Sequence, residues 1–382
     1  MKNLTRWTAL AIVVLLYSCG STFGQENETL DKAVDWLVAQ QDESGAFKSK
    51  HYGAMKQGAA MTSLALYSLS MTPEDCREKH EDVFEKAFEF LLPGTTARGR
   101  VANPDGSLDH PVYSTAMLLV AAKRLDQDLD PDLVTKLLDF LVRSQCVAGR
   151  GFEPDNPNYG GWDVIGPDIM PGKTSGTNVS VARFVLEAFA SHVPLDGDAD
   201  SKIDKGVVKR VTESRRLAVE WLQRLHTSSS DGGFHFSAQP DSALNKSRSR
   251  DDKPKPYGSA TCDGLIALHF SGAIDGDPFK KASSWIASQT TAEKIGGFEN
   301  QKESAWPKAL KLYYLQSFSL ATKFMAGVEE PKKQTSYENI EIELGKAQKE
   351  DGRFQNASAL MRENDPLVAT SFAIIALGSS AD

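Results

Sequence analysis

Residues 30–47 read LDKAVDWLVAQQDESGAF, a stretch in which an apolar periodicity is followed by glutamine and then by glycine. Apolar residues stand at helical spacing in its first half, at Leu30, Ala33, Val34 and Leu37, which predicts a helix buried on one face. Gly45 marks a chain reversal, because glycine adopts a positive φ at little cost. The stretch therefore predicts an amphipathic helix that ends at a tight turn.

The same pattern recurs along the whole chain. A small or aliphatic residue, two variable residues and a large residue begin at Ala33, Ala87, Leu137, Ala218, Ala282 and, in a degenerate copy, Ile340. Glycine turns that end on a hydrophobic residue stand at 45–47, 105–108, 160–162, 231–234, 296–298 and 351–354. Six repeats of about 60 residues predict a single repeat domain over 25–382 rather than two domains.

A second helix of different character follows each turn. These segments are apolar nearly all round, as buried helices are, and they lie at 58–69, 114–122, 179–190, 260–270, 310–321 and 366–377. Each repeat is thus predicted to combine an outer amphipathic helix with an inner apolar helix. Neither end of the chain carries the polar capping repeat that an open array needs. The predicted fold is all-α: a closed α/α toroid of six helical hairpins.

The first 24 residues have the layout of a secretory signal. Lys2 and Arg6 precede an apolar run at 10–17 that is short for a membrane span, and small residues lead to Gly24. A lipoprotein signal with Cys19 lipidated is an alternative, and an uncleaved anchor is a third. No later segment is long and apolar enough to cross a membrane. We expect an exported protein, periplasmic or in the cell envelope.

Composition and motifs exclude several classes of function. The chain has 43 basic and 51 acidic side chains, a net charge of −8, which argues against a general nucleic-acid binder. The four cysteines are far apart and form neither a disulfide framework nor a CxxC pair. A P-loop-like stretch at 171–174 and a calcium-loop-like stretch at 196–207 both lack glycines that those motifs require. We therefore expect no metal and no cofactor.

The repeats carry a family resemblance. A glutamine follows several outer helices, at Gln40, Gln145, Gln289 and Gln348, before the glycine turn and its aromatic residue. This order resembles the QW-type repeats of squalene–hopene cyclases and the repeats of protein prenyltransferase β subunits. Segments 159–184 and 257–268 look like those of exported bacterial members. The resemblance implies the toroid fold over about 350 residues, but a fold alone does not define an activity.

The catalytic acid of the cyclases has no counterpart at its usual place. Those enzymes protonate an alkene with an aspartate of a DxDD motif that precedes Thr-Ala-Met. Here Thr-Ala-Met stands at 115–117, and Pro111, Tyr113 and Ser114 occupy the aspartate positions. Alkene protonation demands a strong, positioned acid, which these side chains do not supply. Asp109 and His110 lie close by, before the motif.

The zinc site of the prenyltransferases is also missing. Those enzymes bind zinc through an Asp-x-Cys pair and a distant histidine. The nearest match here is Cys262–Asp263, and adjacent helix residues point about 100° apart, which makes a poor chelate. Asp263 nevertheless stands out as a charge within an apolar helix. It is either a carboxylate favoured by the helix N-terminus or a catalytic acid that faces a cavity.

The predicted ring places a candidate binding site at one mouth. Because the inner helices run parallel, every outer-to-inner connection lies on one rim, and the long connections are 93–111, 146–177, 230–258 and 290–306. The inner-helix N-termini face this mouth and favour an anionic group. Candidate ligand-binding residues are His110, Tyr113, Tyr159, Trp162, Asn178, Tyr257, Thr261 and Trp306, although the aromatic side chains alternatively only pack the rim. Residues 237–256 form either a surface loop or a lid.

Three functions remain open on the sequence. The first is a non-catalytic toroid that binds a partner or a ligand, which is apolar or amphipathic, such as an isoprenoid-like lipid, or is a glycan. The second is an isoprenoid-acting enzyme that uses Asp263 or Asp109. The third is a polysaccharide lyase or hydrolase, which requires converging carboxylates or a base with a cation.

Overall fold

The computed structural model describes residues 28–168, 170–196, 200–227, 231–239, 242–299, 301 and 303–379. Within these residues the regular structure is helical, and the β pairing consists of two isolated bridges. The predicted all-α class is confirmed. The proposed signal at 1–24, with Cys19, lies outside the described residues.

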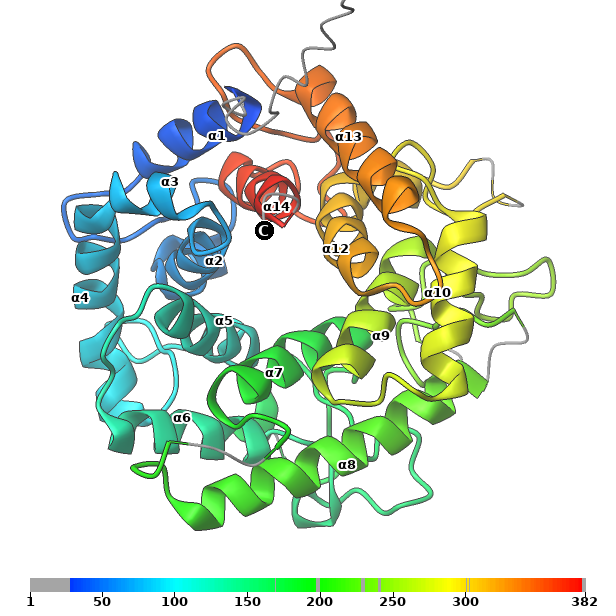
Figure 1. Cartoon of the computed structure of the whole chain (residues 1–382). Coiled ribbons are helices and arrows are strands. Elements are labelled where there is room, and N and C mark those ends of the chain that lie inside the picture. Colours follow the sequence, from blue (N-terminus) through cyan, green and yellow to red (C-terminus); the bar gives the residue numbers. More distant parts are fainter. Residues whose placement is uncertain are drawn as a thin grey trace, which may run out of the picture.

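Six helices surround the central axis, and six more surround them (Figure 1). The inner helices are α2 (Ala59–Leu69), α5 (Pro111–Arg124), α7 (Val179–His192), α9 (Gly258–Phe270), α12 (Lys311–Phe324) and α14 (Pro366–Gly378). The outer helices are α1 (Glu28–Val38), α4 (Glu81–Arg98), α6 (Pro131–Arg143), α8 (Lys205–Thr227), α10 (Asp277–Gln289) and α13 (Glu330–Ala347). The short helices α3 (Glu74–Glu78) and α11 (Trp306–Ala309) lie in connections, as do three 3-10 turns, Gly53–Lys56, Ala148–Arg150 and Gly166–Asp168.

The ring is closed by its first and last elements. Each inner helix packs against the next one, and α14 packs against α2. Outer helices pack mainly on the inner helix that precedes them in the chain, so α1 has no such partner and packs on α14 instead (Figure 1). The predicted toroid is therefore confirmed, with each packed pair formed by an inner helix and the outer helix that follows it.

Glutamine side chains join consecutive outer helices. Gln145 Nε2 donates to the carbonyl of Gly160 in the glycine turn (2.8 Å) and to that of Ser214 on α8 (2.9 Å). Gln348 makes the same two contacts at the seam, to Gly352 (2.9 Å) and to Thr29 on α1 (2.8 Å). In the first repeat Gln41 has this role, rather than the predicted Gln40.

The glycines of the turns are required by both conformation and space. Gly45 and Gly352 have φ values of 82° and 91°, which favour glycine. A Cβ atom at Gly45 would lie 2.1 Å from the carbonyl oxygen of Lys86 on α4, and one at Gly352 would lie 2.3 Å from that of Lys32 on α1. The turns thus permit the close approach of neighbouring outer helices.

Threonines on the inner helices hold the ends of the turns. Thr62, on α2, accepts the backbone N–H of Phe47 (3.0 Å), and the same bond recurs for Thr261 with Phe234 and Thr370 with Phe354. In the second repeat Thr115 accepts the N–H of Val101, which follows the left-handed Gly99, so the equivalent turn precedes the predicted one at 105–108. These bonds fix the turn-ending residue against the inner helix, where its side chain is buried.

No helix in the described ranges is long and apolar enough to cross a membrane.

One boundary differs from the prediction. The connection at 93–111 is predicted to begin at Pro93. Instead, α4 continues through this residue to Arg98 and ends at Gly99, whose φ is 64°. A proline inside a helix removes one backbone donor. The helix tolerates it here and stops only at the left-handed glycine cap.

Candidate functional site

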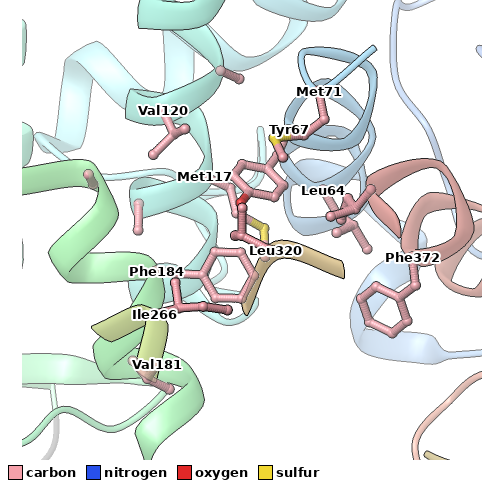
Figure 2. Close-up of a cluster of buried hydrophobic side chains, with 14 of the residues drawn as sticks. Leu64, Tyr67, Met71, Met117, Val120, Val181, Phe184, Ile266, Leu320 and Phe372 are labelled. Carbon is pink, nitrogen blue, oxygen red and sulfur yellow. The ribbon is translucent and has the colours of Figure 1, made fainter. Parts of the chain in front are cut away.

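A cavity of about 480 Å³ opens at the N-terminal ends of the inner helices. Its wall is mainly apolar, and the apolar lining residues are Met55, Ala60, Leu64, Met117, Phe184, Ala243, Leu244, Leu360, Met361, Val368 and Phe372, together with the indole of Trp306. Figure 2 shows Leu64, Met117, Phe184 and Phe372 projecting from different inner helices toward one central region. The predicted mouth is therefore the place where the structure forms a cavity.

Basic side chains, but no carboxylates, are found among the lining residues. Lys246, Arg362 and His110 contribute to the wall, and the remaining polar groups are the hydroxyls of Tyr113, Ser114 and Tyr313. The guanidinium of Arg362 lies over the ring of Tyr52 at 5.3 Å. This cavity is therefore apolar in its walls and electropositive in its ionisable groups.

Lys246 is held by aromatic rings. Its side chain belongs to a residue that is only 9% exposed, and Nζ lies 3.9 Å from the ring centroid of Phe236 and 5.6 Å from that of Trp306. Burial lowers the pKa of this ammonium to about 8. The surrounding loop is ordered by hydrogen bonds from Asn245 to the carbonyls of Ser237 (3.2 Å) and Gln239 (3.0 Å).

His110 is paired with the carboxylate of Asp109. The distance between His110 Nδ1 and Asp109 Oδ1 is 2.5 Å, and Asp109 is buried. His110 has a φ of 48°, an uncommon conformation for a residue other than glycine. Ser114 Oγ lies 3.1 Å from the carbonyl of His110, which helps to fix this turn. A histidine oriented by a carboxylate is able to accept or donate a proton at the cavity wall.

A chain of hydroxyls leads from the cavity floor into the protein. Tyr113 donates to Ser180 Oγ (2.8 Å), which is in turn hydrogen-bonded to the hydroxyl of Tyr313. Tyr313 donates to Asp263 Oδ2 (2.7 Å), and Ser317 donates to Asp263 Oδ1 (2.8 Å). Asp263 is thus one hydrogen bond away from the cavity without lining it.

Below the cavity floor, charged and neutral polar side chains form a buried polar cluster. Its members are Tyr67, Arg183, Glu187, Asp263 and Gln316. Arg183 is fully buried, with Nη1 3.9 Å from Asp263 Oδ1 and 3.1 Å from Gln316 Oε1. Tyr67 donates to Glu187 (2.8 Å), which also pairs with Arg124 (3.2 Å). Desolvation raises the pKa of Asp263, and Arg183 opposes that shift. The cluster fills the ring below the cavity.

Of the predicted site residues, the structure brings His110, Tyr113 and Trp306 together at the cavity. Asp263, the predicted catalytic acid, lies in the buried polar cluster and is shielded from the cavity by Tyr313. Its position in an apolar helix is explained by donors on α12 and by Arg183 on α7.

Trp162 and Tyr257, which are expected at or near the mouth, are both fully buried and are not among the cavity-lining residues. Trp162 donates from Nε1 to the carbonyl of Leu141 (2.8 Å) and packs against Phe189. The ring of Tyr257 stacks on Phe236 and packs at a tilt against Phe298. These large rings fill the space that the glycine turns leave between helices, so they lie away from the cavity lining.

Asn178, Thr261 and Tyr159 also lie away from the cavity. Asn178 caps α7 by accepting the N–H of Val181 (3.0 Å), and Thr261 accepts the N–H of Phe234 (3.1 Å). Tyr159 belongs to the long connection before α7, and its carbonyl accepts a hydrogen bond from Arg224. These positions have structural contacts, and none of the three residues is part of the wall.

Lys246 and Arg362 are the site residues that sequence reasoning missed. Both stand in irregular connections, between α8 and α9 and between α13 and α14, where no periodicity identifies them. The only sequence signal for Lys246 is the length of segment 237–256, which is predicted to form either a surface loop or a lid. Its residues Ala243, Leu244 and Lys246 form part of the cavity wall.

Comparisons with known proteins show the fold. No protein-family model matches the chain, and no curated protein sequence matches it. A solved structure of a protein from Actinoplanes is 14% identical, with a TM-score of 0.57, and the match covers 93% of this chain and 99% of that one.

Two enzymes have the same architecture. A variant of the type II terpene cyclase MstE from Scytonema, in complex with geranylgeranyl dihydroxybenzoate, is 13% identical with a TM-score of 0.55, covering 92% of this chain and 96% of that one. The GH76A α-1,6-mannanase from Salegentibacter is 12% identical with a TM-score of 0.56, covering 93% and 98%. At these identities the likeness shows the toroid fold alone.

Proposed function

We propose that the protein binds an apolar or amphipathic small molecule in its central cavity. The observation that carries the proposal is a cavity of about 480 Å³ whose wall is formed mainly by Leu, Met, Phe and Val side chains. Ligand sites are typically concave and largely apolar, with volumes of about 300–1,000 Å³. We also propose membership of the squalene–hopene cyclase and prenyltransferase superfamily, which the repeat pattern and the terpene cyclase fold support.

The composition of the wall favours a lipid-like ligand over a glycan. Glycosidases use two carboxyl groups about 5–10 Å apart. The cavity-lining residues include no carboxylate. The match to the mannanase therefore supports the shared fold more than a shared reaction. The terpene cyclase complex shows that a toroid of this kind holds a substrate with an isoprenoid chain.

A second candidate is an acid–base enzyme that acts on such a ligand. Its support is the Asp109–His110 pair, because the His110 ring is part of the cavity wall and Asp109 orients it. In that case His110→Gln abolishes turnover of the bound molecule while binding persists. Unchanged turnover in this variant would exclude His110 as the acid or base.

A cavity-filling substitution tests the proposed binding. Ala60 lines the cavity on α2, so Ala60→Phe places a ring in the space for the ligand. Binding of decanol or decanoate, measured by calorimetry, should weaken at least about tenfold. Ala287→Phe, on the exposed face of α10, is the matched control and should bind like the wild type. Equal affinities for all three proteins would place the ligand elsewhere.

We further propose that the protein is exported, with its signal at residues 1–24. The support is the basic, apolar and small-residue order at this terminus. Fractionation of expressing cells, with intact mass of the envelope form, tests it. Cleavage after Gly24 and a lipidated Cys19 give different masses, and an uncleaved chain in the cytoplasm would contradict the proposal.

A further inference from the structure

Lys246 stands at the junction of two hollows. Ala243, Lys246 and Trp306 line the central cavity and also a neighbouring, more open groove of about 950 Å³. The other lining residues of this groove are mostly polar: Asn245, Arg248, Arg250, Glu299, Gln301, Glu303, Ser304 and Ala305. An apolar space therefore meets a polar one at the ammonium group of Lys246.

The ammonium of Lys246 has no carboxylate partner within the described residues, although its residue is only 9% exposed. Two other buried cations do have a carboxylate nearby: Arg183 lies near Asp263, and Arg150 pairs with Asp163 at 3.4 Å. Arg215, which is also buried, instead donates to the backbone carbonyl of Val193, whereas Lys246 faces two aromatic rings. A buried charge without a counter-ion is costly. The contacts of Nζ with Phe236 and Trp306 stabilise the cation only in part.

Building on the proposed function, we infer that Lys246 binds the anionic head group of an amphipathic ligand whose apolar chain occupies the central cavity. A carboxylate and a phosphate monoester share the required chemistry, since each offers oxygens that accept from an ammonium. The groove beyond Lys246 carries both signs of charge, with Arg248 and Arg250 as well as Glu299 and Glu303 among its lining residues.

The wild-type protein gives a pH signature of this contact. Burial lowers the pKa of Lys246 to about 8, so the ammonium becomes neutral across pH 7–9 unless an anion is bound. The other charged groups that face it are His110 and Arg362 in the cavity, and Arg248, Arg250, Glu299 and Glu303 in the groove. Affinity for an anionic ligand should therefore fall as the pH rises through this range, while affinity for a neutral one should stay constant.

Calorimetry of three ligands with alkyl chains of equal length tests the inference. The ligands are decanoate, decyl phosphate and decanol. At pH 7 we expect at least one anion to bind about tenfold more tightly than decanol. Lys246→Met should remove this advantage and the pH dependence but keep decanol binding, and Lys246→Arg should restore most of the advantage. Lys253→Met, at an exposed lysine of the same loop, is the matched control. His110→Gln should keep the pH dependence.

The possible results separate the two proposals. Equal binding of all three chains would overturn the role of Lys246 and leave the proposed function standing, whereas binding of none would overturn both. A preference for one anion identifies the head group. Should Lys246→Met fail to fold, Lys246→Gln takes its place, and an anion advantage that persists in that neutral variant contradicts the inference.

Discussion

The first turns of the inner helices and the turns that follow them form two different environments. At the N-terminal turns the wall is apolar, and the cationic side chain of Lys246 has no acidic partner among the lining residues. One or two turns further on, Arg183, Asp263 and Glu187 contact one another directly or through Tyr67. The ion pair of Arg183 and Asp263 is thus part of the buried packing, whereas Lys246, which has no such partner among the lining residues, stands at the cavity.

This difference separates stability from binding. Replacement of one member of a buried ion pair leaves the other uncompensated, which is strongly destabilising. Replacement of a residue beside an existing cavity removes fewer contacts. Substitutions in the buried polar cluster should therefore lower the free energy of unfolding, whereas those in the cavity wall should change ligand affinity.

The largest effect is expected from Asp263→Ala. The variant leaves Arg183, Tyr313 and Ser317 without their acceptor, so we expect a loss of about 3–5 kcal/mol in the free energy of unfolding. Denaturant unfolding measures it. Asp275→Ala, at an exposed position, is the control and should change stability by less than about 0.5 kcal/mol. A similar small change for Asp263→Ala would refute the stabilising role of the cluster.

Two leucines on α2 compare packed core with cavity wall. Leu66 is fully buried, so Leu66→Ala should cost about 2–5 kcal/mol in unfolding free energy and leave ligand affinity unchanged. Leu64 lines the cavity, so Leu64→Ala should cost less than about 2 kcal/mol and change the affinity for decanoate. The reverse order of the two losses in denaturation would mean that the cavity wall is packed as tightly as the core.

Glu363 gives a pH dependence of stability beside the cavity. It is fully buried and accepts the backbone N–H groups of Leu312 (3.2 Å) and Tyr313 (2.9 Å) at the start of α12. Desolvation outweighs these bonds and raises its pKa to about 7. The folded protein therefore retains a proton that the unfolded chain loses above about pH 4.5.

Because of the titration of Glu363, the free energy of unfolding should fall by at most about 3 kcal/mol as the pH rises from about 4.5 to 7. Glu363→Gln, which carries no titrating group, should flatten this part of the profile. Thermal unfolding of both proteins across the range measures the difference. Parallel profiles would show that Glu363 titrates at its ordinary value.

The smallest effect distinguishes two tyrosine hydroxyls. Tyr67 donates to the charged Glu187, so Tyr67→Phe should cost about 1.5–3 kcal/mol in unfolding free energy. Tyr113, at the border of the cavity, donates to the neutral Ser180, so Tyr113→Phe should cost about 0.5–1.5 kcal/mol. Equal costs in chemical denaturation would remove the distinction between the two environments.

The fold and the location of the cavity follow from the sequence, because both depend on periodicity. Parallel inner helices place their N-termini on one rim, and the cavity opens there. The fate of Asp263 does not follow, since its partners Arg183 and Tyr313 come from two other helices far away in the sequence. Lys246 and Arg362 lie in irregular connections, whose paths depend on tertiary contacts rather than on a local pattern.

The aromatic residues show a second limit. Trp162 and Trp306 both follow glycine-containing segments or connections near the mouth, yet the first is fully buried and the second lines the cavity. Composition identifies both as large apolar groups with one donor. Only the packing of neighbouring helices decides which of them fills the core.

Mass spectrometry of the molecules that co-purify with the protein from the cells that produce it tests the central claim most directly. We predict a lipid-like species that is released on denaturation and absent from the Ala60→Phe variant, because that substitution fills the cavity. Retention of glycan fragments, or of the same lipid by wild type and variant alike, would contradict an apolar ligand site at the centre of the ring.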